Sequence, residues 1–212
     1  MITRNAILHG DCITLMQRLQ SGSVDFILTD PPYLVRYRDR HGRTVANDDN
    51  ADWLKPAFGQ MYRILKPNSL AVSFYGWNEV DRFAEAWREA GFRIVGHLVF
   101  AKPYASSRRF LQHTHEQAYL LAKGRPPFPA TKLSDIQSWD YTANRLHPTQ
   151  KPVRPLKSLI RALTKPNDLV LDPFCGSGST LVAAHDTGRD FLGMELDSRH
   201  YLSARLRLHH AL

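Results

Sequence analysis

The sequence has few of the features that mark secreted or membrane proteins. Cys12 and Cys175 are its only cysteines and lie 163 residues apart, so a disulfide framework is not expected and a reducing cytoplasm fits. No apolar run approaches the roughly 20 residues that span a bilayer. The first residues, Met-Ile-Thr-Arg-Asn, lack the apolar run of a signal peptide. We therefore expect a cytoplasmic protein without a membrane segment.

Two common nucleotide-binding motifs are incomplete. Residues 172–180 read Asp-Pro-Phe-Cys-Gly-Ser-Gly-Ser-Thr. No third glycine falls three places after Gly178, as the dinucleotide fingerprint requires, and no lysine follows it, as in a phosphate-binding loop.

Around His113 and His115 no cysteine or acidic partner completes a ligand set, so no metal is expected.

The pattern of apolar residues predicts one α/β domain. The chain has 212 residues, of which 43% are apolar, enough to bury a core. The alternation of strands and helices indicates a mostly parallel sheet covered on both faces. The predicted strands are 6–9, 24–29, 70–75, 93–101, 116–122, 169–171 and 191–194, and the predicted helices are 12–20, 51–66, 78–90, 155–163, 179–187 and a last one from Asp197.

A loop of sequence Asp-Pro-Pro-Tyr, residues 30–33, follows the apolar run 24–29. Its two prolines end the strand, because each lacks an N–H and fixes φ. The loop presents a carboxylate, two carbonyls and an aromatic ring at the carboxyl end of a strand, where open α/β sheets bind ligands. Taken alone, the pattern also fits an ordinary turn, since Asp-Pro commonly opens turns.

A second loop of similar make, residues 172–180, favours the binding interpretation. It lies between an apolar strand and a helix, whose free N–H groups suit a carboxylate or phosphate. Gly176 and Gly178 allow tight turning and close approach of a ligand. Glu195 ends the next strand, where an acidic residue accepts hydrogen bonds from ribose hydroxyls; by itself it would be a helix cap. Together these features predict a site for a nucleoside with an amino-acid tail rather than for NAD.

With these motifs the chain resembles the beta-class amino-group DNA methyltransferases, which use S-adenosylmethionine. Residues 30–33 match the family's catalytic loop, residues 172–180 its cofactor loop, and residues 147–152 (His-Pro-Thr-Gln-Lys-Pro) the segment that leads into the cofactor half. The catalytic half comes first, which is the beta arrangement. The resemblance implies a single domain, 1–212, with a Rossmann-like, circularly permuted sheet of seven mostly parallel strands and one antiparallel strand among them.

The resemblance also implies roles for residues at matching positions. Glu195 would hold the ribose, and Asp11 would receive the adenine amino group of the cofactor, with Leu196 against the ring. Thr149 and Lys151 would reach the cofactor carboxylate. The expected cofactor-binding residues are Asp11, Cys12, Thr149, Lys151, Asp172, Pro173, Phe174, Cys175, Gly176, Gly178, Ser179, Thr180, Glu195 and Leu196, and the expected catalytic residues are Asp30, Pro31, Pro32 and Tyr33.

The residue types of the first loop fit chemistry on an exocyclic amine. Such an amine is a poor nucleophile, because its lone pair is delocalised into the base. The Asp30 carboxylate and the rigidly held Pro31 carbonyl would accept its hydrogens and turn the lone pair toward the methyl donor. Tyr33 would stack on the base, a contact worth about 1–3 kcal/mol. A base in a duplex must be flipped out to reach such a loop. Asp in the first position favours adenine N6, whereas Ser is more usual for cytosine N4.

Positive charge is concentrated in one segment. Residues 102–165 carry 12 basic and 3 acidic side chains, a net of +9, whereas the other 148 residues carry 16 and 17, a net of −1. This stripe favours double-stranded DNA as a partner; a solubility surface would spread the charge more evenly. We expect short target-recognition segments at 102–114 and 124–145, and a homodimer is common in the family. The expected DNA-binding residues are Arg36, Arg38, Arg40, Arg43, Arg108, Arg109, Lys123, Arg125, Lys132 and Arg145.

The sequence thus predicts a site-specific DNA adenine-N6 methyltransferase of bacterial, phage or plasmid type. We expect it to be associated with the nucleoid and to act in restriction–modification. One alternative keeps the fold but acts on cytosine N4 or on RNA. Another is a catalytically silent DNA-binding relative that uses the cofactor only for stability. The intact Asp30 argues against the silent relative, which has no need for that carboxylate.

Overall fold

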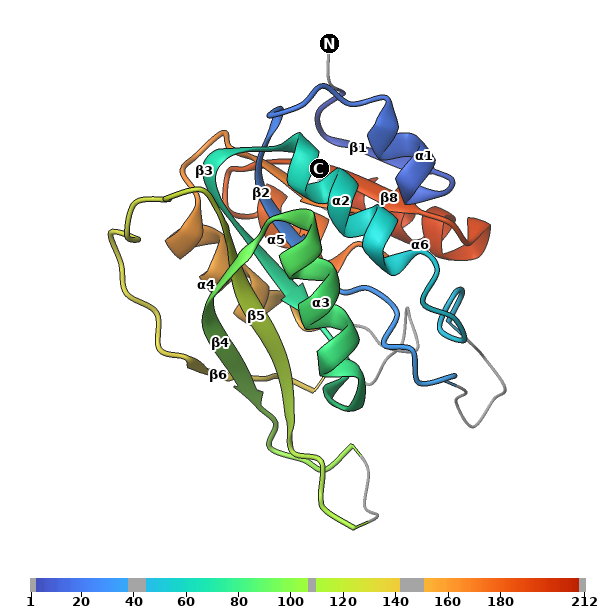
Figure 1. The fold of residues 1–212 in the computed structure, drawn as a ribbon, viewed down its shortest axis with the longest axis vertical. Coiled ribbons are helices and arrows are strands. Elements are labelled where there is room, and N and C mark those ends of the chain that lie inside the picture. Colours follow the sequence, from blue (N-terminus) through green and yellow to red (C-terminus); the bar gives the residue numbers. More distant parts are fainter. Residues whose placement is uncertain (1–2, 38–44, 107–109, 142–150, 210–212) are drawn as a thin grey trace.

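The chain folds around one mixed sheet. The computed structural model describes residues 3–37, 45–106, 110–141 and 151–209. These residues form eight strands in the order β1-β8-β7-β2-β3-β5-β4-β6 (Figure 1). Among the described strands, β5 alone runs antiparallel to its neighbours, which confirms the predicted antiparallel strand. The strands are β1 (Ala6–His9), β2 (Val24–Thr29), β3 (Leu65–Phe74), β4 (Arg93–Ala101), β5 (His115–Lys123), β6 (Ile136–Ser138), β7 (Leu169–Asp172) and β8 (Asp190–Glu195).

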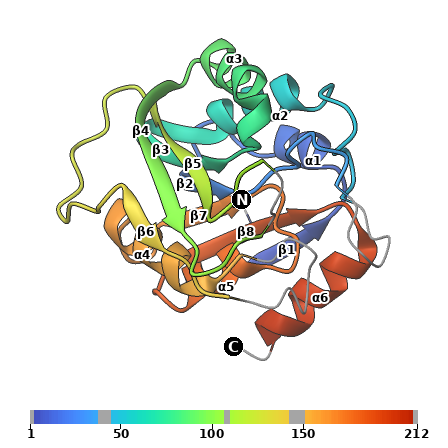
Figure 2. The ribbon, with the colours of Figure 1, turned by 90° about the horizontal axis from the view of Figure 1, so that it is seen from below.

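Helices cover both faces of the sheet (Figure 2). Successive residues of β2 point to opposite faces: Ile27 packs with α1, α2 and α3, and Phe26 and Leu28 pack with α4, α5 and α6. No helix in the described part of the chain is long and apolar enough to cross a membrane. The helices are α1 (Cys12–Gln17), α2 (Leu54–Ile64), α3 (Val80–Ala90), α4 (Val153–Leu163), α5 (Ser179–His185) and α6 (Ser198–His209), with a 3-10 turn at Trp77–Glu79 before α3.

The two halves of the chain meet where β7 pairs with β2. Phe26 lies opposite Val170 and Ile27 opposite Leu171 in a parallel register. Because β1, β8, β7 and β2 are parallel neighbours, their carboxyl ends lie at one edge of the sheet. The loops that follow these four strands therefore lie side by side, although they come from opposite ends of the sequence.

The sheet has one strand more than the seven predicted. The additional strand is β6, which pairs in parallel with the end of β4, with Val99 opposite Ile136. A strand of three residues is too short to show a two-residue period, so the sequence pattern does not reveal it. The strand β3 also begins at Leu65, directly after α2 and before the predicted start at residue 70.

Lys123, the last residue of β5, closes the corner between α2 and β3. Its ammonium donates hydrogen bonds to the carbonyl oxygens of Tyr62 and Leu65, both at 2.6 Å, and lies 4.6 Å from the centre of the Tyr62 ring. Carbonyls at the end of a helix lack partners within it. Since β5 is antiparallel, this corner lies at the edge of the sheet opposite to the loop that follows β2.

Replacing this lysine should weaken the fold. Lys123→Met removes two charge-assisted hydrogen bonds to main-chain carbonyls, and we expect the free energy of unfolding to fall by about 1–3 kcal/mol. Urea denaturation followed by circular dichroism measures this change. Lys132→Met alters an exposed side chain and is the matched control, with an unchanged midpoint. Equal midpoints for the two variants would show that the corner contacts contribute nothing.

Candidate active site

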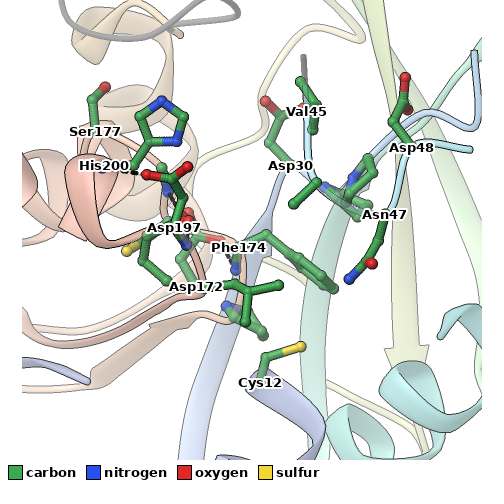
Figure 3. Close-up of a pocket in the computed structure, with 18 of the residues that line it drawn as sticks. Cys12, Asp30, Val45, Asn47, Asp48, Asp172, Phe174, Ser177, Asp197 and His200 are labelled. Carbon is green, nitrogen blue, oxygen red and sulfur yellow. Dashed lines mark hydrogen bonds between the residues drawn. The ribbon is translucent and has the colours of Figure 1, made fainter. Parts of the chain in front are cut away.

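A pocket opens at the carboxyl ends of the four neighbouring strands. Residues from the β2 side, such as Asp30 and Asp48, face residues from the β7 and β8 side, such as Asp172 and Phe174, across one cavity (Figure 3). The lining comprises residues 10–12, 30–33, 35, 37, 45–48, 151, 172–177, 179, 180, 195–197 and 200. The structure therefore brings together all four predicted catalytic residues and, of the predicted cofactor residues that it describes, every one except Gly178.

The Asp-Pro-Pro-Tyr loop is tightly held at the mouth of β2. Pro31 and Pro32 are buried, and the Tyr33 hydroxyl donates to Asp30 Oδ1 at 2.9 Å. Behind the loop, Gly76 follows β3; a Cβ at that position would come within 2.6 Å of the Tyr33 carbonyl oxygen. Only glycine allows this close approach, so the end of β3 fixes where the loop lies.

Lys151 points to the catalytic loop. Its Nζ lies 2.9 Å from Asp30 Oδ1 and donates to the Tyr33 hydroxyl at 3.0 Å. Burial raises the pKa of the Asp30 carboxyl, and the charge of Lys151 opposes that rise. The predicted contact of Lys151 with the cofactor carboxylate stays a prediction, whereas its ion pair with Asp30 is a feature that sequence reasoning missed.

Asp48 holds the chain that follows Tyr33. Its carboxylate accepts hydrogen bonds from the N–H groups of Leu34 at 2.7 Å and Tyr37 at 2.6 Å, and the residue is 3% exposed. Leu34 and Arg36 have φ of 63° and 52°, a left-handed conformation that costs non-glycine residues energy. The buried Asp48 offsets that strain. One Asp in a polar stretch of sequence carries no signal for this role.

The glycine-rich loop is closed against the end of β8. The Gly176 N–H donates to Glu195 Oε2 at 2.9 Å, and the Asp197 N–H donates to Glu195 Oε1 at 2.8 Å. Each oxygen retains capacity for a further hydrogen bond, since a carboxylate accepts about four, and Glu195 lines the pocket. Gly178 has φ of 79° and faces α6, where an added Cβ would come within 3.2 Å of the Ala204 Cβ. It shapes the turn without lining the pocket.

Asp11 lies on the far side of Glu195, after β1. Its Oδ2 accepts from the backbone N–H and the hydroxyl of Thr14, both at 2.8 Å, and so caps α1. This leaves Oδ1 without a partner among the described residues. Leu196 is 45% exposed at the same end of the pocket, where an apolar side chain suits an aromatic ring.

Other lining residues form hydrogen bonds or ring contacts with neighbouring residues of the protein. Asp172 accepts from the Phe174 N–H at 3.1 Å, and burial raises the pKa of its carboxyl to about 7. Ser179 donates its hydroxyl to the Lys151 carbonyl oxygen at 2.8 Å. Phe174 packs against the Trp53 ring, with ring centres 5.1 Å apart. These contacts set the shape of the cavity.

The two cysteines do not provide a nucleophile. Both are buried and unpaired. Burial raises the pKa of the Cys12 thiol to about 12 and that of Cys175 well above its usual value, so neither forms a thiolate near neutral pH. Among the described residues, no group of three or more His, Cys, Asp or Glu could hold a metal ion.

Those predicted DNA-binding residues that the structure describes are not gathered in one place. Arg36 is exposed beside the pocket, and Lys132 is exposed between β5 and β6. Lys123 and Arg125 lie at the opposite edge of the sheet, because β5 runs antiparallel, so the structure does not bring them to the pocket. The remaining predicted residues, Arg38, Arg40, Arg43, Arg108, Arg109 and Arg145, and the predicted cofactor residue Thr149, lie outside the described residues.

Comparison with known proteins agrees with this site. The family model described as DNA methylase, of the N6/N4 type, matches residues 24–205. The putative methylase YubD of Escherichia coli (strain K12) is 54% identical over 201 residues, which cover 95% of this chain and 88% of that protein. Type II methyltransferase M2.LlaDCHI of Lactococcus lactis subsp. cremoris is 29% identical over 242 residues, covering 96% of this chain and 89% of that protein.

A solved structure extends the likeness to three dimensions. The M1.HpyAVI–SAM complex matches with a TM-score of 0.76 and 26% identity, over 95% of this chain and 98% of that one. The family model spans most of the chain, and the relative from Escherichia coli covers nearly all of it at more than half identity. The chain therefore belongs to the N6/N4 family of DNA methyltransferases.

Proposed function

We propose that the protein transfers a methyl group from S-adenosyl-L-methionine to the exocyclic N6 of adenine in DNA, on a base flipped out of the duplex. The observation that carries this proposal is the single pocket in which the Asp30 loop and the Glu195 and Gly176 loop face each other. One side offers acceptors to an amine, and the other offers acceptors to a nucleoside. The family supports methyl transfer to DNA, and M1.HpyAVI is a relative solved as a SAM complex.

The cofactor side of the pocket suits a nucleoside. When bound, the cofactor supplies an electrophilic methyl group on a sulfonium. The sulfur is left as a neutral thioether once the methyl group is transferred. Glu195 would accept hydrogen bonds from the two ribose hydroxyls, because the N–H groups of Gly176 and Asp197 use only part of its acceptor capacity. Asp11 would receive the adenine amino group at Oδ1, which has no partner among the described residues. Phe174, held against Trp53, lies between this half and the catalytic loop and lines the methionine side.

The catalytic side activates the amine of the base. Asp30 accepts a hydrogen bond from one amine N–H and the Pro31 carbonyl accepts one from the other, which turns the lone pair toward the methyl group. The N–C bond forms as the C–S bond breaks, and the methylated nitrogen then loses one proton to solvent. An ionised carboxylate accepts without donating, so this step requires Asp30 to be charged. Tyr33, whose hydroxyl is tied to Asp30, stacks its ring on the base. Aspartate at this position favours adenine over cytosine, as the resemblance to the family implies.

The segments 102–114 and 124–145 are proposed to contact DNA. Since β4 and β6 run parallel to β2, β4, which precedes 102–114, and β6, which lies within 124–145, end at the same edge of the sheet as the Asp30 loop. Residues 102–106 and 110–114 extend beyond the sheet (Figure 1). The rings of Tyr104 and Tyr141, one from each segment, pack together with their centres 4.9 Å apart, and Tyr141 is 71% exposed. These segments form a surface on which a duplex delivers its flipped base.

Neutralising Glu195 should weaken cofactor binding. Glu195→Gln removes a charged acceptor that the ribose and the Gly176 N–H share, so we expect the cofactor Kd to rise about 10- to 100-fold. Isothermal titration calorimetry with S-adenosylmethionine measures this. Burial raises the pKa of Glu195, so in the wild type affinity should fall with decreasing pH earlier than an exposed glutamate would cause. Asp190→Asn, at the other end of β8 beside Arg4, is the control with unchanged affinity.

Removing the Asp30 charge should stop transfer and spare cofactor binding. Asp30→Asn keeps the shape of the side chain but loses a charged acceptor, and we expect single-turnover transfer to DNA to fall at least about 10²- to 10³-fold. Labelled cofactor reports the rate and calorimetry reports the affinity. Asp81→Asn, on the exposed face of α3, is the control. Transfer at the wild-type rate by Asp30→Asn would refute the assigned role.

The base itself is identified by mass spectrometry. DNA methylated by the protein and digested to nucleosides should yield N6-methyldeoxyadenosine. Deoxy-N4-methylcytidine would shift the proposal to cytosine, and methylation of RNA alone would exclude DNA as the substrate. Cofactor binding without turnover on any nucleic acid would favour a silent DNA-binding relative.

A further inference from the structure

A second ion pair lies between the end of β4 and the start of β5. Lys102 follows β4, Glu116 stands near the start of β5, and their side chains form an ion pair. The Lys102 side chain is only 4% exposed and that of Glu116 is 23% exposed. The Lys102 ammonium is therefore largely shielded from solvent, although Lys102 belongs to the most basic segment of the chain, and the Glu116 carboxylate is partly exposed.

Lys151 interacts electrostatically with both Asp30 and Glu116. Its ammonium contacts Asp30 Oδ1 at 2.9 Å and the Tyr33 hydroxyl at 3.0 Å. The rings of Tyr33, Phe74 and Trp139 surround it, with Nζ 5.1, 5.0 and 5.9 Å from their centres. Aromatic faces attract a cation and exclude water from it. The lysine side chain, 9% exposed, is thus held in one place.

The four charges alternate in sign along the row Asp30, Lys151, Glu116 and Lys102. Burial lowers the pKa of Lys151, but Asp30 and Glu116 outweigh burial and raise it. Burial raises the pKa of Glu116, but Lys151 and Lys102 outweigh it and lower that pKa. Lys151 therefore stays charged beside Asp30. Its positive charge interacts with the carboxylates of both Asp30 and Glu116. Without the Glu116 charge, the ionised form of Asp30 would be more strongly favoured beside Lys151.

We propose that Lys151 is a positioning residue for methyl transfer, which holds the Asp30 carboxylate ionised and aimed at the amine, and that Glu116 sets how strongly it does so. This inference rests on the proposed role of Asp30. A protonated Asp30 would lose an acceptor for the amine, so the ammonium beside it maintains the reactive form. The row also links the catalytic loop to the end of β4 and the start of β5, between which the proposed recognition segment 102–114 lies.

The charged groups around Asp30 determine the direction of each effect. Lys151, from the segment before α4, stabilises the carboxylate, and the Tyr33 hydroxyl donates to it. Glu116 of β5 disfavours it, and Asp172 at the end of β7 and Asp30 repel each other when both are ionised. Tyr104, beyond Lys151, acts on the lysine. Removing Lys151 should therefore raise the pKa of Asp30, and removing the Glu116 charge should lower it.

The test is the pH profile of single-turnover methyl transfer in the full-length protein. Lys151→Met should move the acid limb of the profile upward by about 1–3 pH units, the usual effect of losing an adjacent opposite charge. Glu116→Gln should move it in the opposite direction. Lys151→Arg keeps the charge and should leave the limb near its wild-type position at a lower rate. Lys157→Met, a lysine of α4 paired with Asp186, is the matched control with no shift.

Two further measurements make the outcome decisive. The cofactor Kd of Lys151→Met should stay within about threefold of wild type, and carbon-13 NMR of the Asp30 carboxyl should show the same opposite shifts. A tenfold loss of cofactor affinity with an unmoved acid limb would overturn the proposal and assign Lys151 to the cofactor carboxylate. If the wild type methylates no nucleic acid, the proposed function fails, but the NMR titration still decides the pairing. Should Lys151→Met fail to fold, an unmoved limb in Glu116→Gln refutes the inference.

Discussion

The pairing of β2 with β7 is the constraint on which the rest of the molecule depends. It is a short parallel contact, with Phe26 opposite Val170 and Ile27 opposite Leu171. It joins the first part of the chain, which carries the Asp30 loop, to the last part, which carries the glycine loop. Because parallel strands end at one edge, this register alone places two loops that are far apart in sequence around a single pocket.

Buried charge is the second organising feature. Burying a carboxylate without a partner is costly, and the pocket collects several at its strand ends. The chain offsets the cost differently at each position: Glu195 accepts two backbone N–H groups, Asp48 binds the N–H groups of the loop after Tyr33, and Asp30 is paired with Lys151. Lys102 and Lys151 therefore serve the interior, so the positive charge of residues 102–165 is not all available to DNA.

Sequence patterns predicted most elements of the fold, and they failed where a side chain acts through distant parts of the chain. The helix and strand periods identified the alternating order, and the antiparallel strand near 116–122 is present as β5. The strand β6 is defined by its pairing with β4 and not by its own composition. Lys123 belongs to a basic stretch, but its carbonyl partners on α2 and β3 are about 60 residues away in sequence. Local patterns carry no information on such partners.

The sequence by itself determined the family, the two motif loops and the acidic residue at the end of β8. These are local features, because a proline pair, a glycine turn and a strand-ending carboxylate act through the backbone next to them. Only the tertiary structure decided which charges meet. It directed Lys151 to Asp30, placed Glu116 and Lys102 behind them, and set Asp48 against the loop after Tyr33. The reason is that the partner of a buried charge is chosen by the packing of the sheet, whose strands come from the whole length of the chain.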